Sequence, residues 1–170
     1  MLVLAIILSV ERLYNKALFN VSADFIVSLH ASLKSNWLDQ FFSLYSAMSD
    51  IEVYYIAFLI ALSFAGTARG YYYCCMISAI WVTKNFAKLV YHEPRPYMTD
   101  DRVLTIDCEK DFGNPSGHST QSAAFAVFFV LDIGHRRFSS FKLGVALGLA
   151  CLYFMLVGFG RVYQGLHSLN

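Results

Sequence analysis

Four long apolar segments, separated by short polar or charged stretches, constrain the fold of this chain more than any other feature. They run over Ile51–Gly66, Tyr71–Tyr91, Ser116–Leu131 and Leu143–Tyr163. Of the 170 residues, 57% are hydrophobic and only 15% are charged, which is more apolar surface than a soluble domain of this size can bury. The sequence therefore predicts an all-α fold, a polytopic transmembrane helix bundle.

The residues before these segments are not predicted to form complete membrane spans. Met1–Val10 is apolar but far shorter than the roughly 20 residues that cross a bilayer, and it is interpreted as the remainder of a first span. Residues 22–50 mix apolar and polar positions at helical spacing, which is typical of short amphipathic helices before the core spans. Residues 1–170 are expected to form a single membrane domain, incomplete at the C-terminus and, if the first stretch is a shortened span, at the N-terminus.

The connections between the segments differ in charge. Alternate connections share a side of the membrane, which groups Arg69 with the basic turn 132–142. Loop 92–115 lies on the other side and contains six acidic residues and all three prolines. Because positive residues favour the cytoplasmic side, we expect an integral membrane protein whose long loop is lumenal or extracellular.

Two classes of function are disfavoured by composition. A net charge of +1 gives no support for nucleic-acid binding. Three of the four cysteines lie inside apolar segments, and only Cys108 stands in the polar loop. Neither a disulfide framework nor a metal cluster is therefore predicted.

Ionisable residues at the ends of three apolar segments fall on the side of the long loop. Charged groups at membrane depth are costly, so they are functional candidates. Lys88 precedes Arg95 by seven residues, but Pro94 and Pro96 prevent a helix from continuing through Arg95. We expect Arg95 on an extended segment, where its planar guanidinium can bind two phosphate oxygens beside the Lys88 ammonium.

The second cluster, Asn114 to His118, stands where the loop becomes a helix. The unpaired amides of a helix N-terminus bind phosphate, and Gly117 lets an anion approach the backbone closely. Ser116 adds a hydroxyl donor. His118 is placed to give a proton to a departing oxygen.

The third cluster pairs Arg161 with His167 at the end of the last segment. A separation of six residues puts them on different faces of a regular helix. Both reach one phosphate only if the helix ends between them, which Gly165 permits. A neutral imidazole can attack phosphorus and hold the phosphoryl group covalently. Each cluster alone has an ordinary structural explanation, such as a snorkelling lysine or a helix cap, but their joint occurrence on one side predicts a phosphate site.

These clusters resemble the three signature motifs of the type 2 phosphatidic acid phosphatase superfamily, which includes vanadium haloperoxidases, glucose-6-phosphatase and sphingoid-base phosphate phosphatases. The first motif is Lys, six residues, Arg-Pro, and Lys88 to Pro96 fits it in full. The second, Pro-Ser-Gly-His, is present as Pro115 to His118. The resemblance extends over roughly residues 38–170.

The third motif departs from the family pattern. It reads Ser-Arg, five residues, His, three residues, Asp; Arg161 and His167 keep their places, but Gly160 replaces the serine. The aspartate, which normally fixes the tautomer of the histidine, would be residue 171, one past Asn170. The chain is therefore interpreted as truncated within the third motif and, as written, as catalytically impaired. The loss of the serine hydroxyl is expected to matter less.

The resemblance implies a phosphatase that uses a phosphohistidine intermediate and needs no metal or other cofactor. It implies these site residues: catalytic His167 as nucleophile and His118 as proton donor, and phosphate-binding Lys88, Arg95, Ser116, Gly117 and Arg161.

The predicted function is hydrolysis of a lipid phosphate of the phosphatidate, sphingoid-base phosphate or isoprenyl phosphate type, with membrane lipids as partners. Two alternatives stay open. Residues 108–114 are similar to the corresponding stretch of glucose-6-phosphatase, which favours a sugar phosphate. The missing aspartate favours a catalytically inactive lipid-binding or structural membrane subunit. A haloperoxidase is disfavoured because those enzymes are typically soluble.

Overall fold

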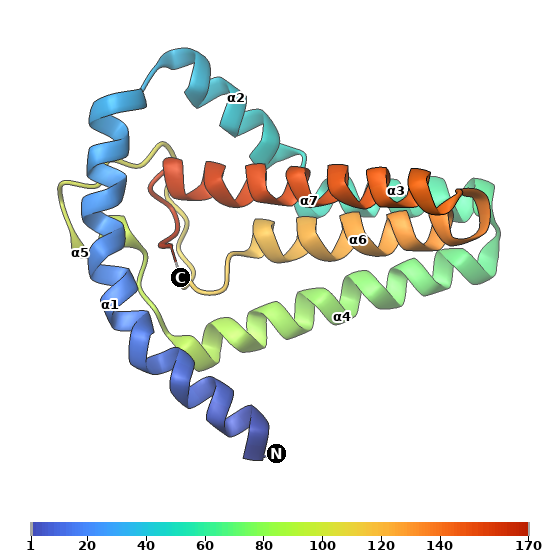
Figure 1. Cartoon of the computed structure of the whole chain (residues 1–170), viewed down its shortest axis with the longest axis horizontal. Helices are drawn as coiled ribbons and strands as arrows, with labels where there is room; N and C mark the ends of the chain where they lie inside the picture. The colour runs from blue at the N-terminus through green and yellow to red at the C-terminus, as the bar shows by residue number, and fades with distance from the viewer. Residues whose placement is uncertain (1, 170) are drawn as a thin grey trace.

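The computed structural model describes residues 2–169, whose regular structure is entirely helical. The helices are α1 Leu2–Leu33, α2 Asn36–Ala47, α3 Ile51–Ala65, α4 Thr67–Tyr91, α5 Pro96–Thr99, α6 Gly117–Arg137 and α7 Ser140–Tyr163 (Figure 1). The all-α prediction is confirmed for these residues.

Helices α3, α4, α6 and α7 run roughly side by side, with α6 packed along α7 and α3 along α4 (Figure 1). Tyr54 of α3 stacks on Phe125 of α6, with ring centroids 4.1 Å apart. The α3–α4 and α6–α7 turns lie at one end of this bundle. The loop between α4 and α6 lies at the other end, together with the end of α7.

The turn predicted over 132–142 is too long. Helix α6 continues to Arg137, and α7 begins at Ser140, whose neighbour Ser139 caps it by accepting a hydrogen bond from the Lys142 amide. Asp132, the acidic residue at which the turn was predicted to begin, lies inside α6. The helix accommodates it because the Tyr73 hydroxyl donates to its carboxylate at 2.8 Å. A side chain from a neighbouring helix thus satisfies a carboxylate that the sequence alone places in a turn.

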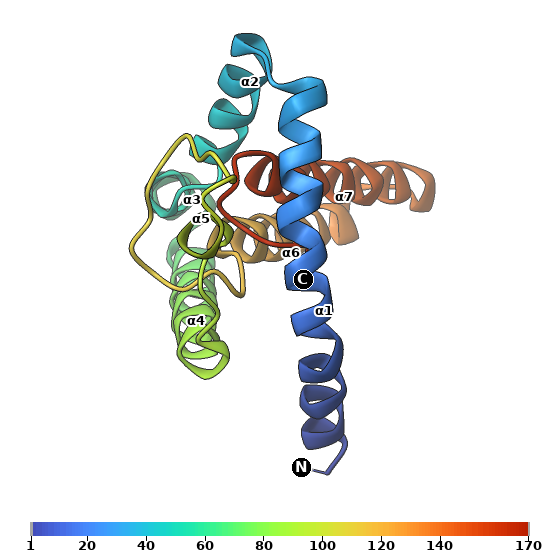
Figure 2. The same cartoon turned by 90° about the vertical axis from the view of Figure 1, so that its left-hand side faces the viewer.

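The N-terminal third also differs from expectation. Residues 2–10, interpreted as the remainder of a first span, belong to the single 32-residue helix α1, which also contains residues 22–33; Met1 lies outside the described residues. Helix α1 crosses the bundle end instead of running along it, and α2 leads obliquely from α1 toward α3 (Figures 1 and 2). The position of α1 follows from its packing on α5 and α7, and no local sequence pattern specifies that packing.

Among the described helices, α7 is by itself long and apolar enough to cross a bilayer, with 24 residues. Helices α2 and α3 meet the same criterion only as a pair, bent by 49°. Helix α3 alone has 15 residues. The polytopic part of the fold prediction is therefore not established by helix length and composition.

Glycine at position 160, where the family has serine, is explained by packing between α2 and α7. Phe42 of α2 is 5% exposed and packs near Phe159 and Tyr163 of α7. A Cβ at Gly160 would lie 2.8 Å from Cδ1 of the Phe42 ring. The space beside Gly160 is thus filled by an aromatic ring from another helix.

We expect Gly160→Ser to lower the free energy of unfolding by about 1–3 kcal/mol, because overpacking forces rings and backbone to shift. Thermal unfolding in detergent measures the effect. Gly148→Ser is the matched control, since nothing lies within 4 Å of a Cβ at Gly148 on the same helix. Equal unfolding temperatures for the two variants would contradict this packing role.

Candidate active site

The first cluster is assembled where α4 ends. Lys88 lies in the last turn of α4 and is 5% exposed. Arg95 precedes α5 with an extended backbone, φ −77° and ψ 151°, as the flanking prolines predict. Its side chain is fully buried, and it donates to the carbonyls of Asp111 and Leu166, each at 2.9 Å. The guanidinium thus ties the loop to the end of the chain.

The second cluster forms the N-terminus of α6. Ser116 is the N-cap residue, and its Oγ accepts hydrogen bonds from the amide and the hydroxyl of Ser119 at 3.3 and 3.0 Å. Since both bonds use oxygen lone pairs, the Ser116 hydroxyl can still donate its hydrogen to a ligand. A Cβ at Gly117 would lie 3.0 Å from Nζ of Lys84, a close contact that a small shift of the flexible lysine side chain would relieve.

The third cluster depends on how α7 ends. The helix stops at Tyr163, and Gly165 takes φ +72°, a left-handed conformation that glycine adopts at no steric cost. The Gly165 and Leu166 amides donate back to Val162 and Arg161 carbonyls at 2.9 and 3.1 Å. This reversal brings His167 to the same region as Arg161, as the sequence predicts.

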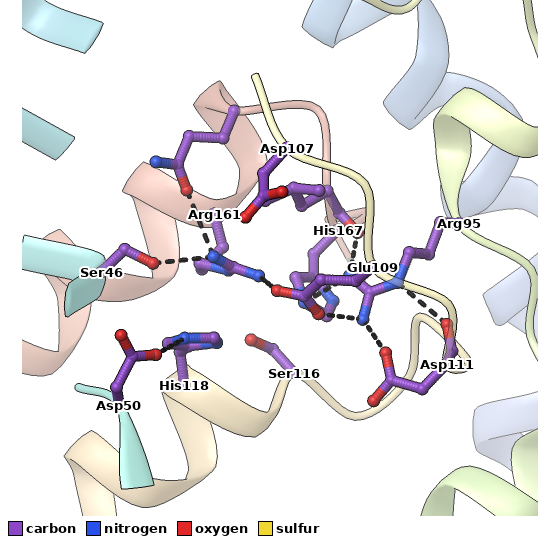
Figure 3. Close-up of polar contacts among 12 residues, drawn as sticks. Ser46, Asp50, Arg95, Asp107, Glu109, Asp111, Ser116, His118, Arg161 and His167 are labelled. Carbon is purple, nitrogen blue, oxygen red and sulfur yellow. Dashed lines mark hydrogen bonds and ion pairs between the residues drawn. The ribbon is translucent and has the colours of Figure 1, made fainter. Parts of the chain in front are cut away.

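Two carboxylates from the loop form ion pairs with the predicted phosphate-binding cations. Glu109 pairs with Arg95 and Arg161, and Asp111 pairs with Arg95 (Figure 3). Asp111 also pairs with Lys88. The oxygens of both carboxylates lie where an anionic ligand of these cations would lie. Sequence reasoning missed both residues; the available signal was a pair of acids directly before the second motif.

The charge state of Asp111 follows from these contacts. Burial alone would raise its pKa, but hydrogen bonds from Lys88 and Arg95 outweigh burial and lower the pKa to about 2. Asp111 is therefore an anion at neutral pH. Its stabilising contribution is present above its ordinary pKa of 3.8 and is lost as the pH falls toward 2.

His167 is held in one tautomer. It is 4% exposed, and its Nδ1 hydrogen donates to the Gly113 carbonyl at 2.5 Å. Nε2 then carries the lone pair, and Nη1 of Arg95 donates to it at 3.1 Å. Burial, together with the nearby Arg95 and Arg161 charges, lowers the pKa of His167 well below its ordinary value, so the ring is neutral.

His118 contacts a residue that the sequence analysis did not identify. Its Nε2 donates to Oδ1 of Asp50 at 2.7 Å. Both side chains, with Glu109, line two cavities of about 330 and 200 Å³. Arg161 lines the larger cavity, and Lys88, Lys84 and Gly117 line the smaller. Lys84 was also missed, although it lies one helical turn before Lys88 and so on the same face.

The structure thus gathers the seven predicted residues at one end of the bundle. Arg95 contacts His167 directly, and the shared carboxylates connect Arg95 to Lys88 and Arg161. In Figure 3, the Glu109 carboxylate lies between Arg161 and Arg95, and His118 and Ser116 lie beneath them at the start of α6. Among the side chains that the structure describes, no group of three or more His, Cys, Asp or Glu is arranged to hold a metal ion.

Comparisons with known proteins show which family this chain resembles. The sequence profile of the PAP2 superfamily matches residues 68–170. The chain is 26% identical to a dihydrosphingosine 1-phosphate phosphatase of Schizosaccharomyces pombe, over 96% of this chain and 39% of that protein. It is 32% identical to lipid phosphate phosphatase delta of Arabidopsis thaliana, over 77% of this chain and 33% of that protein.

The fold resembles a solved structure, a transmembrane PAP2-type phosphatidylglycerolphosphate phosphatase from Bacillus subtilis. The TM-score is 0.70 at 20% identity, covering 88% of this chain and 75% of the other. Because the family profile covers more than half of the residues, the chain belongs to the PAP2 superfamily. It spans between a third and two fifths of the two curated relatives.

Proposed function

We propose that this chain carries the catalytic site of a membrane-embedded lipid phosphate phosphatase that works through a phosphohistidine intermediate. One observation supports this most directly. The Gly113 carbonyl accepts a hydrogen bond from Nδ1 of His167. The Nε2 lone pair therefore lies next to the buried guanidinium of Arg95. A neutral nucleophile beside a phosphate-binding cation is what phosphoryl transfer to histidine requires.

In the first step a phosphate monoester displaces the loop carboxylates. Arg95, Arg161 and Lys88 then bind the nonbridging oxygens, which frees Nε2 of His167. Its lone pair forms the N–P bond while the P–O bond to the alcohol breaks. His118 gives its proton to the departing oxygen, so that the alcohol leaves neutral. The same cations stabilise charge on the equatorial oxygens throughout.

In the second step a water attacks the phosphohistidine. His118, now neutral, takes a proton from the water as the O–P bond forms and the N–P bond breaks. Inorganic phosphate leaves, and His167 recovers its Nε2 lone pair. The Ser116 hydroxyl and the Gly117 amide, at the N-terminus of α6, are proposed to donate to a phosphate oxygen in both steps.

We propose that the bundle spans a membrane, with the site at its lumenal or extracellular face. Large apolar side chains remain exposed on its helices, including Phe64, Phe141 and Leu149, as expected where lipid is the solvent. The basic turns lie at the far end from the site (Figure 1). A lipid tail can then stay in the bilayer while its phosphate reaches the cations.

A phosphate-release panel with the full-length protein in vesicles tests this function. We expect turnover of phosphatidate, sphingoid-base phosphate or an isoprenyl phosphate, in the presence of a chelator and sensitive to vanadate. Preference for glucose 6-phosphate would instead support the sugar phosphatase. Lipid binding without turnover of any substrate would support the inactive subunit and refute the proposal.

The loop carboxylates yield a separate prediction. Glu109→Gln is expected to tighten inhibition by orthovanadate roughly tenfold, because an anion no longer has to displace a carboxylate from Arg95 and Arg161. The inhibition constant measured at neutral pH checks it. Asp107→Asn is the matched control: Asp107 lines the same cavity but accepts a hydrogen bond from the Cys108 amide. Weaker inhibition of the Glu109 variant would contradict competition.

A further inference from the structure

We infer that Asp50 is a positioning residue for the reaction: its carboxylate holds Nε2 of His118, so that the ring exchanges its proton with the leaving group and with water through Nδ1. This inference rests on the proposed phosphatase function. It assigns a role to the turn between α2 and α3, which lies outside all three sequence motifs.

The position of Asp50 supports this role. It is the N-cap residue of α3, with an extended backbone at φ −70° and ψ 149°. Aspartate at this position ordinarily accepts from the first amides of its helix. The Asp50 side chain makes no such capping bond and accepts instead from His118 at 2.7 Å. The start of α3 therefore positions the Asp50 carboxylate but makes no hydrogen bond to it. The carboxylate is free to accept from the His118 imidazole.

The surroundings of His118 explain why a carboxylate is needed. Its ring lies in a region with cations from two helices and acids from three segments: Arg161, Lys84, Lys88, Glu109, Asp111, Glu52 and Asp50. The cations oppose a positive charge on the ring, while Glu109 and Asp111 are already paired with them. Asp50 hydrogen-bonds the ring directly and so stabilises the imidazolium that must donate a proton.

The same contact prepares His118 for both halves of the reaction. In the imidazolium, the Nε2 hydrogen stays on the ring and is donated as a hydrogen bond to Asp50, while the Nδ1 hydrogen passes to the departing oxygen. The neutral ring then keeps its hydrogen on Nε2, and its lone pair on Nδ1 accepts the proton of the attacking water. A carboxylate that fixes one ring nitrogen thereby sets the tautomer for the other.

Asp50→Asn in the full-length protein tests the inference, because asparagine keeps the shape of the side chain but removes its charge. We expect steady-state turnover of an alkyl lipid phosphate to fall about a hundredfold, within the usual range for lost acid–base assistance. With p-nitrophenyl phosphate, whose phenolate leaves without a proton, the first turnover should change little. The basic limb of the pH–rate profile should move to lower pH, because the imidazolium loses its anion.

Two further variants sharpen the test. Asp50→Glu restores the charge and should recover part of the alkyl phosphate activity. Asp101→Asn removes an exposed loop carboxylate that lines neither cavity, and it should leave the turnover of both substrates and the pH profile unchanged. Equal losses on both substrates with an unmoved pH limb would overturn the positioning role. A wild-type protein without phosphatase activity would refute the proposed function, whereas an active wild type matched by Asp50→Asn would refute only this inference.

Discussion

Replacing His167 by alanine is expected to lower phosphate release by about 10⁴-fold or more, the scale seen when a covalent nucleophile is removed. The remaining cations can still bind phosphate, but no lone pair is left at the position that Nε2 occupies beside Arg95. Initial rates with a lipid phosphate in vesicles, measured on the full-length protein, check this result. Phosphate or vanadate binding should persist in the variant.

His92→Asn is the matched control for this substitution. His92 is exposed at the end of α4 with φ 49°, a conformation that asparagine tolerates, and it should retain full activity. The pH profile is a second check. Because burial holds the pKa of His167 well below its ordinary value, the nucleophile stays unprotonated into the acid range. The acid limb should therefore lie below about 6.5. A His167→Ala protein with normal turnover would refute the phosphohistidine mechanism.

Arg95→Lys is expected to cost about 10²–10³-fold in turnover, as when a donor to the transition-state oxyanion is lost. Lysine keeps the charge but not the fork that reaches His167, the Leu166 carbonyl and the loop carboxylates together. The free energy of unfolding should also fall by about 2 kcal/mol, since a buried acceptor left without its donor costs roughly 1–3 kcal/mol. Kinetics and thermal unfolding measure the two effects.

Arg102→Lys is the matched control for that change. Arg102 also pairs with two carboxylates, Asp24 and Asp100, but its side chain is 61% exposed. Surface pairs of this kind contribute little to stability. Turnover and unfolding temperature should stay close to wild type. If both arginine variants behaved alike, the buried network of Arg95 would not have the role assigned to it.

The four helices of the bundle were predictable because their signals are local. Apolar runs indicate α3, α4, α6 and α7, and prolines explain why Arg95 leaves the helix. The C-terminal end of α6 was not predictable, because Asp132 finds its donor, Tyr73, on another helix. The direction of α1 was not predictable either, because contacts with α5, α7 and the loop residue Val103 specify it, and no local pattern does.

The candidate site also has a part that was predictable from the sequence and a part that was not. Motif spacing indicated the cations and both histidines, since phosphate chemistry restricts the residue types that can serve. Asp50 lies 68 residues before its partner His118, and no spacing rule connects them. Nδ1 of His167 donates to the Gly113 carbonyl, 54 residues earlier. Because every residue has a backbone carbonyl, the residue type at position 113 does not reveal that its carbonyl accepts this hydrogen bond.

The sequence by itself determined the helical class, the family and the inventory of charged and nucleophilic side chains, because these depend on local pattern and composition. Only the tertiary structure decided which groups meet: the carboxylates of Glu109 and Asp111 on the cations, Asp50 on His118, and Phe42 against Gly160. The reason is physical. A hydrogen bond or a ring contact acts over a few ångströms of space, and chain separation does not measure that distance.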